Sequence, residues 1–152
     1  MAARLKYGQL ALVGFERMTA LGHYLTTETG LEANLLDLVR LLASLLNGCE
    51  YCINLHRTEL QRLNEPPERI AGVAEWRGSS VYTQRERSAF AWTEAVTNIQ
   101  DGHAPDAVYT QVREHFGEKE TADLTLAITT INAWNRIAIA LGNYSGHTGA
   151  AV

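Results

Sequence analysis

Apolar residues recur every three or four positions over most of the chain, which is the spacing that places them on one face of an α-helix. The clearest examples are the leucine-rich stretch 35–46 and the apolar positions of 121–141. The pattern as a whole predicts seven helices, with approximate bounds 10–30, 32–47, 49–63, 67–74, 83–100, 107–116 and 121–141.

Signals for β-strands are almost absent from the sequence. No long run alternates between apolar and polar residues, and the Asp101-Gly102 pair lies between two predicted helices rather than between strands. Thr83 and Glu86 have the spacing of a capping box, in which each side chain accepts a hydrogen bond from the other residue's backbone N–H at a helix start. These patterns predict an all-α fold, a single domain of about seven helices.

The chain has the length of one domain, 152 residues, and divides into three parts. Residues 1–30 are expected to form an N-terminal helix that packs on the core. Residues 31–142 form the core, and 143–152 form a C-terminal tail.

Composition and charge narrow the functional classes. Hydrophobic residues make up 46% of the chain and charged residues 20%, as in ordinary globular proteins, and the formal net charge is −4. There is no basic stripe to hold a nucleic-acid backbone, and the stretch 35–46 is too short to span a membrane. The first ten residues lack the apolar core of a secretory signal, so we expect a cytoplasmic protein whose cysteines meet a reducing environment.

The segment 47–56, NGCEYCINLH, carries the candidate chemistry. With about 100° of rotation per residue on a helix, Cys49, Cys52 and His56 fall within an arc of about 60° and face one place. Unpaired N–H groups and the dipole at a helix start acidify a thiol, which favours Cys49 as the reactive thiolate. His56 lies one turn from Cys52 and can take its proton, which favours Cys52. The residues alone leave this choice open.

Three other interpretations compete with a redox dithiol. The two cysteines can be small, inert core residues. A thioredoxin-type CxxC needs a preceding strand, and none is predicted here. C-x2-C-x3-H supplies three zinc ligands, but a structural site needs a fourth, and we predict neither a metal nor a cofactor. The remaining histidines form no ligand pair: His23, His103, His115 and His147.

The same segment resembles the core of the alkylhydroperoxidase D-like branch of the carboxymuconolactone decarboxylase superfamily, in which an acid stands eleven residues before C-x2-C-x3-H. Asp37 occupies the position of that acid, where the family usually has Glu. Some members have His between the cysteines, where this chain has Tyr51. Further matches at Trp76, 86–92 and 131–138 extend the similarity to about 31–142.

The resemblance implies an alkylhydroperoxidase D-like helical fold and a thiol-dependent peroxidase that reduces hydroperoxides. Cys52 then attacks a peroxide oxygen and becomes a sulfenic acid, and Cys49 condenses with it to form a Cys49–Cys52 disulfide. His56 and Asp37 move the activating proton with the help of water. A dithiol reductant such as a dihydrolipoyl group restores the thiols.

The expected assembly is a homo-oligomer. Helices 32–47 and 121–141 carry more hydrophobic surface than one small domain readily hides. The family commonly forms dimers, trimers or hexamers, and we expect a hexamer. Nucleic acid and membranes are not expected partners.

Two other functions stay open at this point. One is a carboxymuconolactone decarboxylase-like lyase, although that branch does not depend on a dithiol. The other is a non-enzymatic redox-sensing module.

Several polar and aromatic residues outside the cysteine segment are expected to have structural roles. Trp92 and Trp134 are predicted to lie in the core. Asn132 and Asn135 interrupt an apolar helix face, so they are expected to satisfy buried polar groups or an interface. Tyr51 is expected at the mouth of the site.

Overall fold

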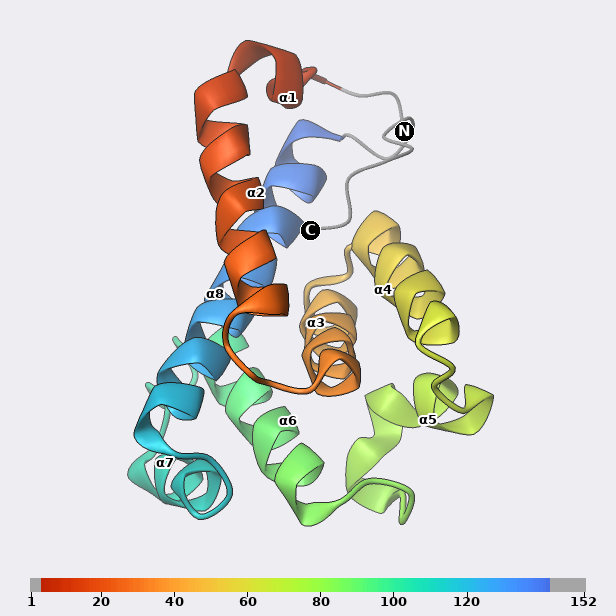
Figure 1. The fold of residues 1–152 in the computed structure, drawn as a ribbon, viewed down its shortest axis with the longest axis vertical. Helices are drawn as coiled ribbons and strands as arrows, with labels where there is room; N and C mark the ends of the chain where they lie inside the picture. Colours follow the sequence, from red (N-terminus) through yellow and green to blue (C-terminus); the bar gives the residue numbers. More distant parts are fainter. Residues whose placement is uncertain (1–3, 143–152) are drawn as a thin grey trace.

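The computed structural model describes residues 4–142, and these residues form eight α-helices and one 3-10 helix without any β-strand (Figure 1). The all-α prediction is thus confirmed. In chain order the elements are α1 (Tyr7–Leu10), α2 (Leu12–Thr27), α3 (Ala33–Asn47), α4 (Glu50–Arg62), α5 (Pro67–Ala71), η1 (Gly72–Gly78), α6 (Gln84–Thr97), α7 (Asp106–Arg113) and α8 (Glu118–Leu141).

Two helices differ from the predicted pattern. The four-residue helix α1 precedes α2 and was not predicted, because it is too short to show a periodic apolar face. The predicted helix 67–74 ends early, and the chain continues as η1, where Glu75 departs from helical geometry with φ −111° and ψ 26°. The change comes at Gly72, a residue that destabilises a helix interior. The predicted tail, 143–152, lies outside the described residues.

Helix α3 lies at the centre of the fold and packs against α4, α6 and α8 (Figure 1). The ten consecutive residues 35–44 are all buried, so this length of the helix has no solvent face. Each fully buried leucine, such as Leu38, contributes about 1.5–3 kcal/mol of hydrophobic stabilisation. Asp37 and Arg40 belong to the same stretch, and their buried charges therefore require partners.

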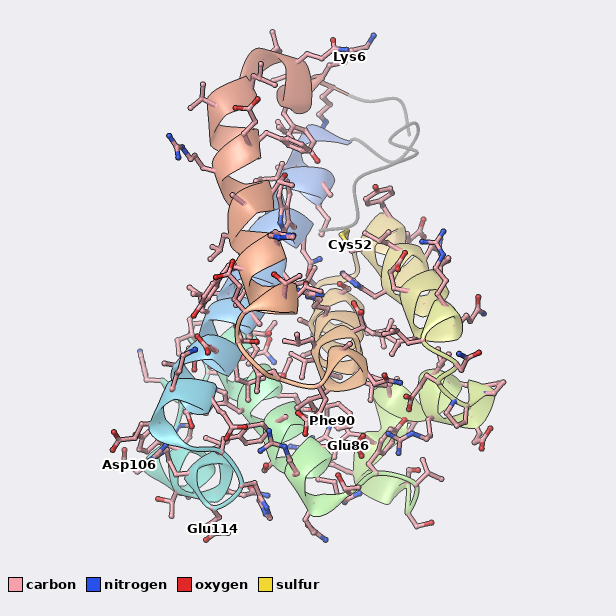
Figure 2. All side chains as sticks on the ribbon, viewed as in Figure 1. Lys6, Cys52, Glu86, Phe90, Asp106 and Glu114 are labelled. Carbon is pink, nitrogen blue, oxygen red and sulfur yellow. A yellow bond between two sulfur atoms is a disulfide. The ribbon has the colours of Figure 1, made fainter. Side chains whose placement is uncertain are left out.

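Aromatic side chains fill the core on the α6 side of α3. The ring of Phe90 is fully buried, and its centroid lies 5.1 Å from that of Tyr82 and 5.7 Å from that of Trp76. Figure 2 shows Phe90 by α6 and Cys52 at the start of α4. Trp92 and Trp134 are each 7% exposed, which confirms their predicted place in the core.

Gly48 makes the turn that joins α3 to α4. Its φ of 69° and ψ of 30° are left-handed, a conformation that glycine adopts without a steric penalty. The Gly48 N–H donates to the Leu45 carbonyl at 3.2 Å, and the Cys49 N–H donates to the Ser44 carbonyl at 3.0 Å. The last carbonyls of α3 are satisfied in this way, and the predicted end of the helix at Asn47 is confirmed.

Helix α8 is the one helix of the described residues that is long and apolar enough to cross a membrane, with 24 residues and a mean hydropathy of 1.2 over an 18-residue stretch. Half of this apolar stretch is buried within the structure, as in the core helix of a globular fold. Helix α2 packs along it, and the Tyr24 hydroxyl donates to Asp123 at 3.0 Å.

The expectation of an oligomer partly rested on the hydrophobic surface of helix 32–47. Most of this surface is buried within the chain itself, because residues 35–44 of α3 are all buried. That part of the reasoning was wrong, although the assembly itself stays a prediction. Large apolar side chains are exposed on the N-terminal segment, namely Leu5 (50%), Leu10 (71%), Leu12 (54%) and Val13 (66%), and to a smaller extent at Leu46 (41%) of α3 and at Leu126 and Ile139 (38% each) of α8.

Thr83 and Glu86 form the predicted capping box at the start of α6. The Glu86 N–H donates to the Thr83 hydroxyl at 3.2 Å, and the Thr83 N–H donates to the Glu86 carboxylate at 2.7 Å. Two backbone donors that the helix leaves unpaired are therefore satisfied by side chains.

Replacing Thr83 by Ala should lower the free energy of unfolding by about 1 kcal/mol, because one cap bond is lost. Thr58→Ala is the matched control, since Thr58 is exposed within α4 and its removal should change stability by less than about 0.5 kcal/mol. Urea unfolding of the two variants measures the difference. Equal effects would show that the capping box does not stabilise the fold.

Candidate active site

Cys49 and Cys52 lie at the N-terminus of α4 and are joined in a disulfide, with their Cα atoms 5.3 Å apart. Cys49 is the N-cap residue, and its sulfur accepts a hydrogen bond from the Cys52 N–H at 3.4 Å. The predicted helix start at Cys49 was wrong by one residue, because α4 begins at Glu50. The two sulfurs are therefore brought together by the extended backbone of the N-cap residue Cys49, and not by the rotation of helical residues alone.

His56 is the candidate base of the site and is only 2% exposed. Its Nδ1 lies 2.9 Å from Oδ1 of Asp37, which α3 presents to α4. An ionised carboxylate can only accept, so Nδ1 carries the proton and donates it to this bond. In a neutral ring Nε2 is then left as an acceptor. Asp37 and His56 are in direct contact, while the water-assisted step between His56 and sulfur stays a prediction.

Burial lowers the pKa of His56 below its ordinary value of 6.5, since the interior disfavours the charged ring. The hydrogen bond and the negative charge of Asp37 oppose this shift, and the positive charge of Arg40 adds to it. His56 is therefore an uncharged base at neutral pH, ready to accept a proton.

Arg40 is the site residue that sequence reasoning missed. Its side chain is 6% exposed, its Nη1 lies 3.4 Å from Oδ1 of Asp37, and its Nη2 donates to the Thr26 hydroxyl at 3.2 Å. The same carboxylate oxygen thus faces both His56 and Arg40. The sequence feature that could have indicated Arg40 is its spacing from Asp37. Residues three positions apart are neighbours on a helix, so an acid and a base at this spacing in an apolar helix can form an ion pair.

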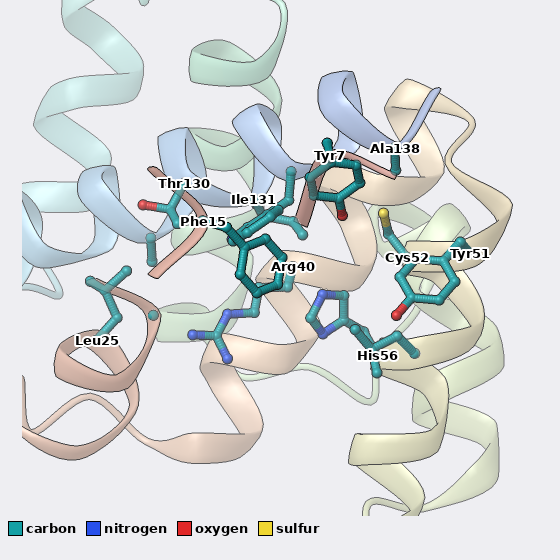
Figure 3. Close-up of a pocket in the computed structure, with 14 residues that line it drawn as sticks. Tyr7, Phe15, Leu25, Arg40, Tyr51, Cys52, His56, Thr130, Ile131 and Ala138 are labelled. Carbon is teal, nitrogen blue, oxygen red and sulfur yellow. The ribbon is translucent and has the colours of Figure 1, made fainter. Parts of the chain in front are cut away.

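A cavity of about 50 Å³ lies beside the disulfide. Cys52, His56 and Arg40 line it, and Figure 3 shows these three side chains around one space. Cys49 is completely buried and is not among the described residues that line the cavity. The volume has room for a few water-sized groups, which is enough for a hydroperoxide group. Most of the wall is apolar: Leu25, Leu55, Ala127, Ile131 and Ala138.

Aromatic side chains cover one side of this cavity. The Phe15 ring meets Trp134 edge-on at 5.3 Å between centroids, and Tyr7 packs on Phe15 at 5.8 Å. Tyr51 also lines the cavity, in agreement with its predicted place at the mouth. No local spacing indicates that Tyr7 and Phe15 belong to the site, because more than a hundred residues separate them from Trp134.

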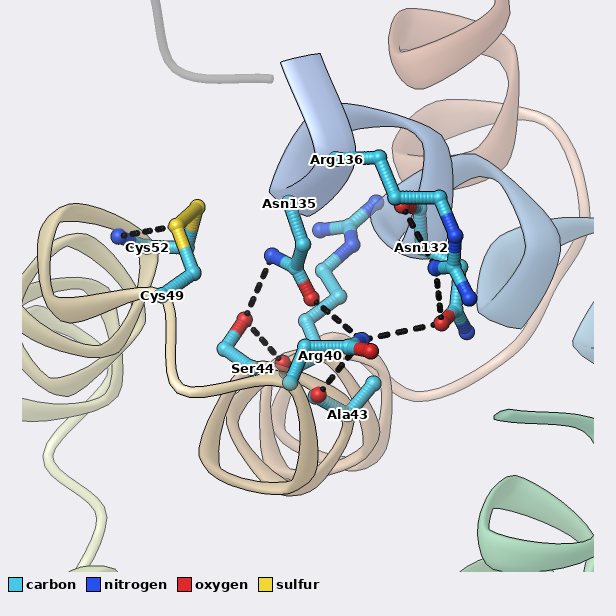
Figure 4. The surroundings of a disulfide bond; sticks show 9 residues. Arg40, Ala43, Ser44, Cys49, Cys52, Asn132, Asn135 and Arg136 are labelled. Carbon is cyan, nitrogen blue, oxygen red and sulfur yellow. Dashed lines mark hydrogen bonds between the residues drawn. A yellow bond between two sulfur atoms is a disulfide. The ribbon is translucent and has the colours of Figure 1, made fainter. Parts of the chain in front are cut away.

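Buried amides hold the end of α3 next to the disulfide (Figure 4). Asn135 donates to the Ser44 hydroxyl at 3.1 Å, and Asn47 donates to the side-chain oxygens of Asn135 and Asn132 at 2.9 Å each. The network fixes the turn before α4, because the Ser44 carbonyl accepts the N–H of Cys49. The expectation that Asn132 and Asn135 satisfy buried polar groups is confirmed.

Within residues 4–142, no group of three or more His, Cys, Asp or Glu side chains is arranged to hold a metal ion. The four predicted site residues do come together, as a Cys49–Cys52 disulfide beside a His56–Asp37 pair. Chemically, this arrangement can pass a proton from a thiol to a histidine and can store two electrons in the sulfur pair.

Comparison with known proteins agrees with the fold and with the resemblance. The model of the carboxymuconolactone decarboxylase family matches residues 14–95, just over half of the chain. The uncharacterised protein YdfG of Bacillus subtilis is 34% identical over 143 residues, which cover 94% of this chain and 97% of YdfG.

Two solved structures share the fold. A protein of unknown function from Agrobacterium tumefaciens, suggested to be the antioxidant defence protein AhpD, superposes with a TM-score of 0.91 at 34% identity over 95% of this chain and 99% of that one. An alkylhydroperoxidase AhpD core from Ralstonia eutropha JMP134, an uncharacterised peroxidase-related protein, gives 0.76 at 19% identity, over 89% and 72%. The second likeness concerns the fold alone.

The lowered pKa of His56 should make stability fall in mild acid. Below pH 6.5 His56 is protonated in the unfolded chain but not yet in the folded chain. The free energy of unfolding therefore decreases as the pH falls from 6.5 toward the pKa of His56 in the folded protein. Urea unfolding of the oxidised protein between about pH 7.5 and 5 measures this slope.

His56→Asn should make that slope shallower, whereas His23→Asn, at an exposed position, should leave it unchanged. Identical slopes in the His56 variant and the parent protein would show that burial does not depress the pKa of this residue.

Proposed function

Because this chain belongs to the carboxymuconolactone decarboxylase family, we propose that it is a thiol-dependent peroxidase that reduces hydroperoxides through Cys49 and Cys52. The observation that carries the proposal is the cavity that Cys52 and His56 line together. A peroxide that enters it meets a sulfur atom and a neutral base at once. The relative from Agrobacterium tumefaciens, suggested to be an antioxidant defence protein, supports the same class of chemistry.

The first step begins with the dithiol form. The Cys52 thiol gives its proton, through a water molecule, to Nε2 of His56, and the thiolate attacks the terminal oxygen of the hydroperoxide. The O–O bond breaks, Cys52 is oxidised by two electrons to a sulfenic acid, and the departing alkoxide takes the proton from His56 to become an alcohol. Asp37 is a positioning residue, since it contacts His56 and stabilises the imidazolium.

Cys52 is assigned the attack because it lines the cavity, whereas Cys49 is completely buried. Proximity to His56 therefore outweighs the helix dipole, which on its own favoured Cys49. In the second step the Cys49 sulfur attacks the Cys52 sulfenic sulfur, the disulfide forms, and water leaves. The N-cap position of Cys49 puts it within reach for this step.

An external dithiol closes the cycle. One thiolate of a reductant such as a dihydrolipoyl group attacks Cys52, the more accessible sulfur, and Cys49 leaves as a thiol. The second thiol of the reductant then displaces Cys52, so the reductant is oxidised to a disulfide as the protein returns to its dithiol form.

The two other functions rank below this proposal. A decarboxylase-like lyase has no use for a dithiol beside a histidine base. A redox-sensing module would undergo the same oxidation of Cys52 but would not turn over with a reductant. The cytoplasmic location belongs to the proposal as a prediction.

The order of the two thiols can be tested by substitution. In Cys49→Ser the first oxidation should proceed and then stop, so that one equivalent of peroxide leaves a sulfenic acid on Cys52, which dimedone traps and mass spectrometry locates. Cys52→Ser is the matched variant, and it should give no rapid dimedone adduct. Labelling of Cys49 in the Cys52 variant would reverse the assignment.

The proposal includes a homo-oligomer, with a hexamer as the expected state. The exposed leucines of the N-terminal segment supply apolar surface for the contacts between copies. Size-exclusion chromatography with light scattering, at micromolar protein, should give about six times the 16.8 kDa of one chain. A monomer peak would contradict the prediction.

A further inference from the structure

Arg40 carries a permanent charge into a cavity that is otherwise mostly apolar. Its side chain is 6% exposed and it lines the same space as Cys52 and His56. A guanidinium has five N–H donors, and among residues 4–142 it finds two acceptors, Asp37 and Thr26. Donors are therefore left over in a place where water is largely excluded.

Arg40 has one carboxylate among the neighbours that the structure describes, and it shares this carboxylate with His56. Oδ1 of Asp37 is 3.4 Å from Arg40 and 2.9 Å from His56, so the shorter contact goes to the histidine. His56 itself is uncharged when buried. A buried cation with one long contact to a shared carboxylate favours a further anion in the cavity.

A second buried hydrogen-bond donor, on a residue that lines the cavity, has no partner among residues 4–142. The indole N–H of Trp134 is buried and finds no acceptor within the described part of the chain. Buried polar groups in native proteins are nearly always satisfied, so such a donor calls for an acceptor supplied from outside. Trp134 and Arg40 both line the cavity of about 50 Å³.

We propose that this cavity binds small apolar molecules that carry a carboxylate, with the carboxylate on Arg40 and the apolar part against the wall of α2 and α8. This deepens the proposed peroxidase function, on which it rests for its substrate: the preferred hydroperoxide is one that bears a carboxylate. The carboxylate is unchanged in the reaction, and the peroxide oxygen passes to Cys52 as described above.

Binding can be measured without turnover on the oxidised protein, whose disulfide does not react with peroxide. Hexanoate and hexanamide have the same shape and differ in charge, and isothermal titration at pH 7.5 in a buffer free of carboxylates compares them. Hexanoate should bind at least about tenfold more tightly, because a guanidinium–carboxylate pair makes charge-assisted hydrogen bonds. Equal affinities, or no binding of hexanoate, would overturn the inference on the unaltered protein.

Two variants locate the binding groups. Arg40→Met should bring the hexanoate to hexanamide ratio close to one, whereas Arg57→Met, at an exposed position on α4, should keep it. Trp134→Phe removes the unpaired N–H together with part of the indole ring and should weaken hexanoate severalfold. Trp92→Phe makes the same change outside the cavity and should not. A ratio that survives Arg40→Met would contradict the assignment.

Kinetics separate this inference from the proposed function. If a neutral hydroperoxide and a carboxylate-bearing one are reduced with equal kcat/KM, the peroxidase stands and the carboxylate site is wrong. If neither is reduced while hexanoate still binds through Arg40, the site stands and the peroxidase is wrong.

Discussion

The carboxylate of Asp37 is the group on which the arrangement of the site depends. It is buried in the central helix α3, and one of its oxygens faces both the ring of His56 and the guanidinium of Arg40. A buried charge without such partners would cost several kcal/mol. The two contacts therefore fix α4 against α3 and set the tautomer of His56. They also hold Arg40 at the cavity.

Helix α3 contributes to both the core and the site. Its buried leucines add hydrophobic stabilisation, and Asp37 of the same stretch contacts His56 of α4. At its end, the left-handed Gly48 turns the chain so that Cys49 caps α4 and Cys52 faces the cavity. Amides of α8 hold this turn through Ser44. The position of the two sulfurs thus depends on tertiary contacts, from α8 to the turn before α4 and from α3 to α4.

Local patterns in the sequence were sufficient for most of the helices, because periodicity and caps such as Thr83 act within a few residues of each other. They also placed Cys52 and His56 one turn apart. Cys49 was assigned to the first turn of the helix, since a helical wheel does not distinguish an N-cap residue from the first turn. Arg40, Tyr7 and Phe15 reach the cavity through contacts with distant segments, which no local spacing reveals. The prediction of surplus apolar surface on helix 32–47 failed because three other helices cover it.

The central claim is that Cys52 and His56 reduce a hydroperoxide repeatedly, with Cys49 closing the disulfide that a dithiol reopens. Its most direct test is the amount of peroxide consumed by a catalytic quantity of pure protein in the presence of excess dihydrolipoamide, after subtraction of the reaction without protein. The account predicts that many equivalents of peroxide disappear per chain. Consumption that stops at one equivalent per chain, or never begins, would contradict it.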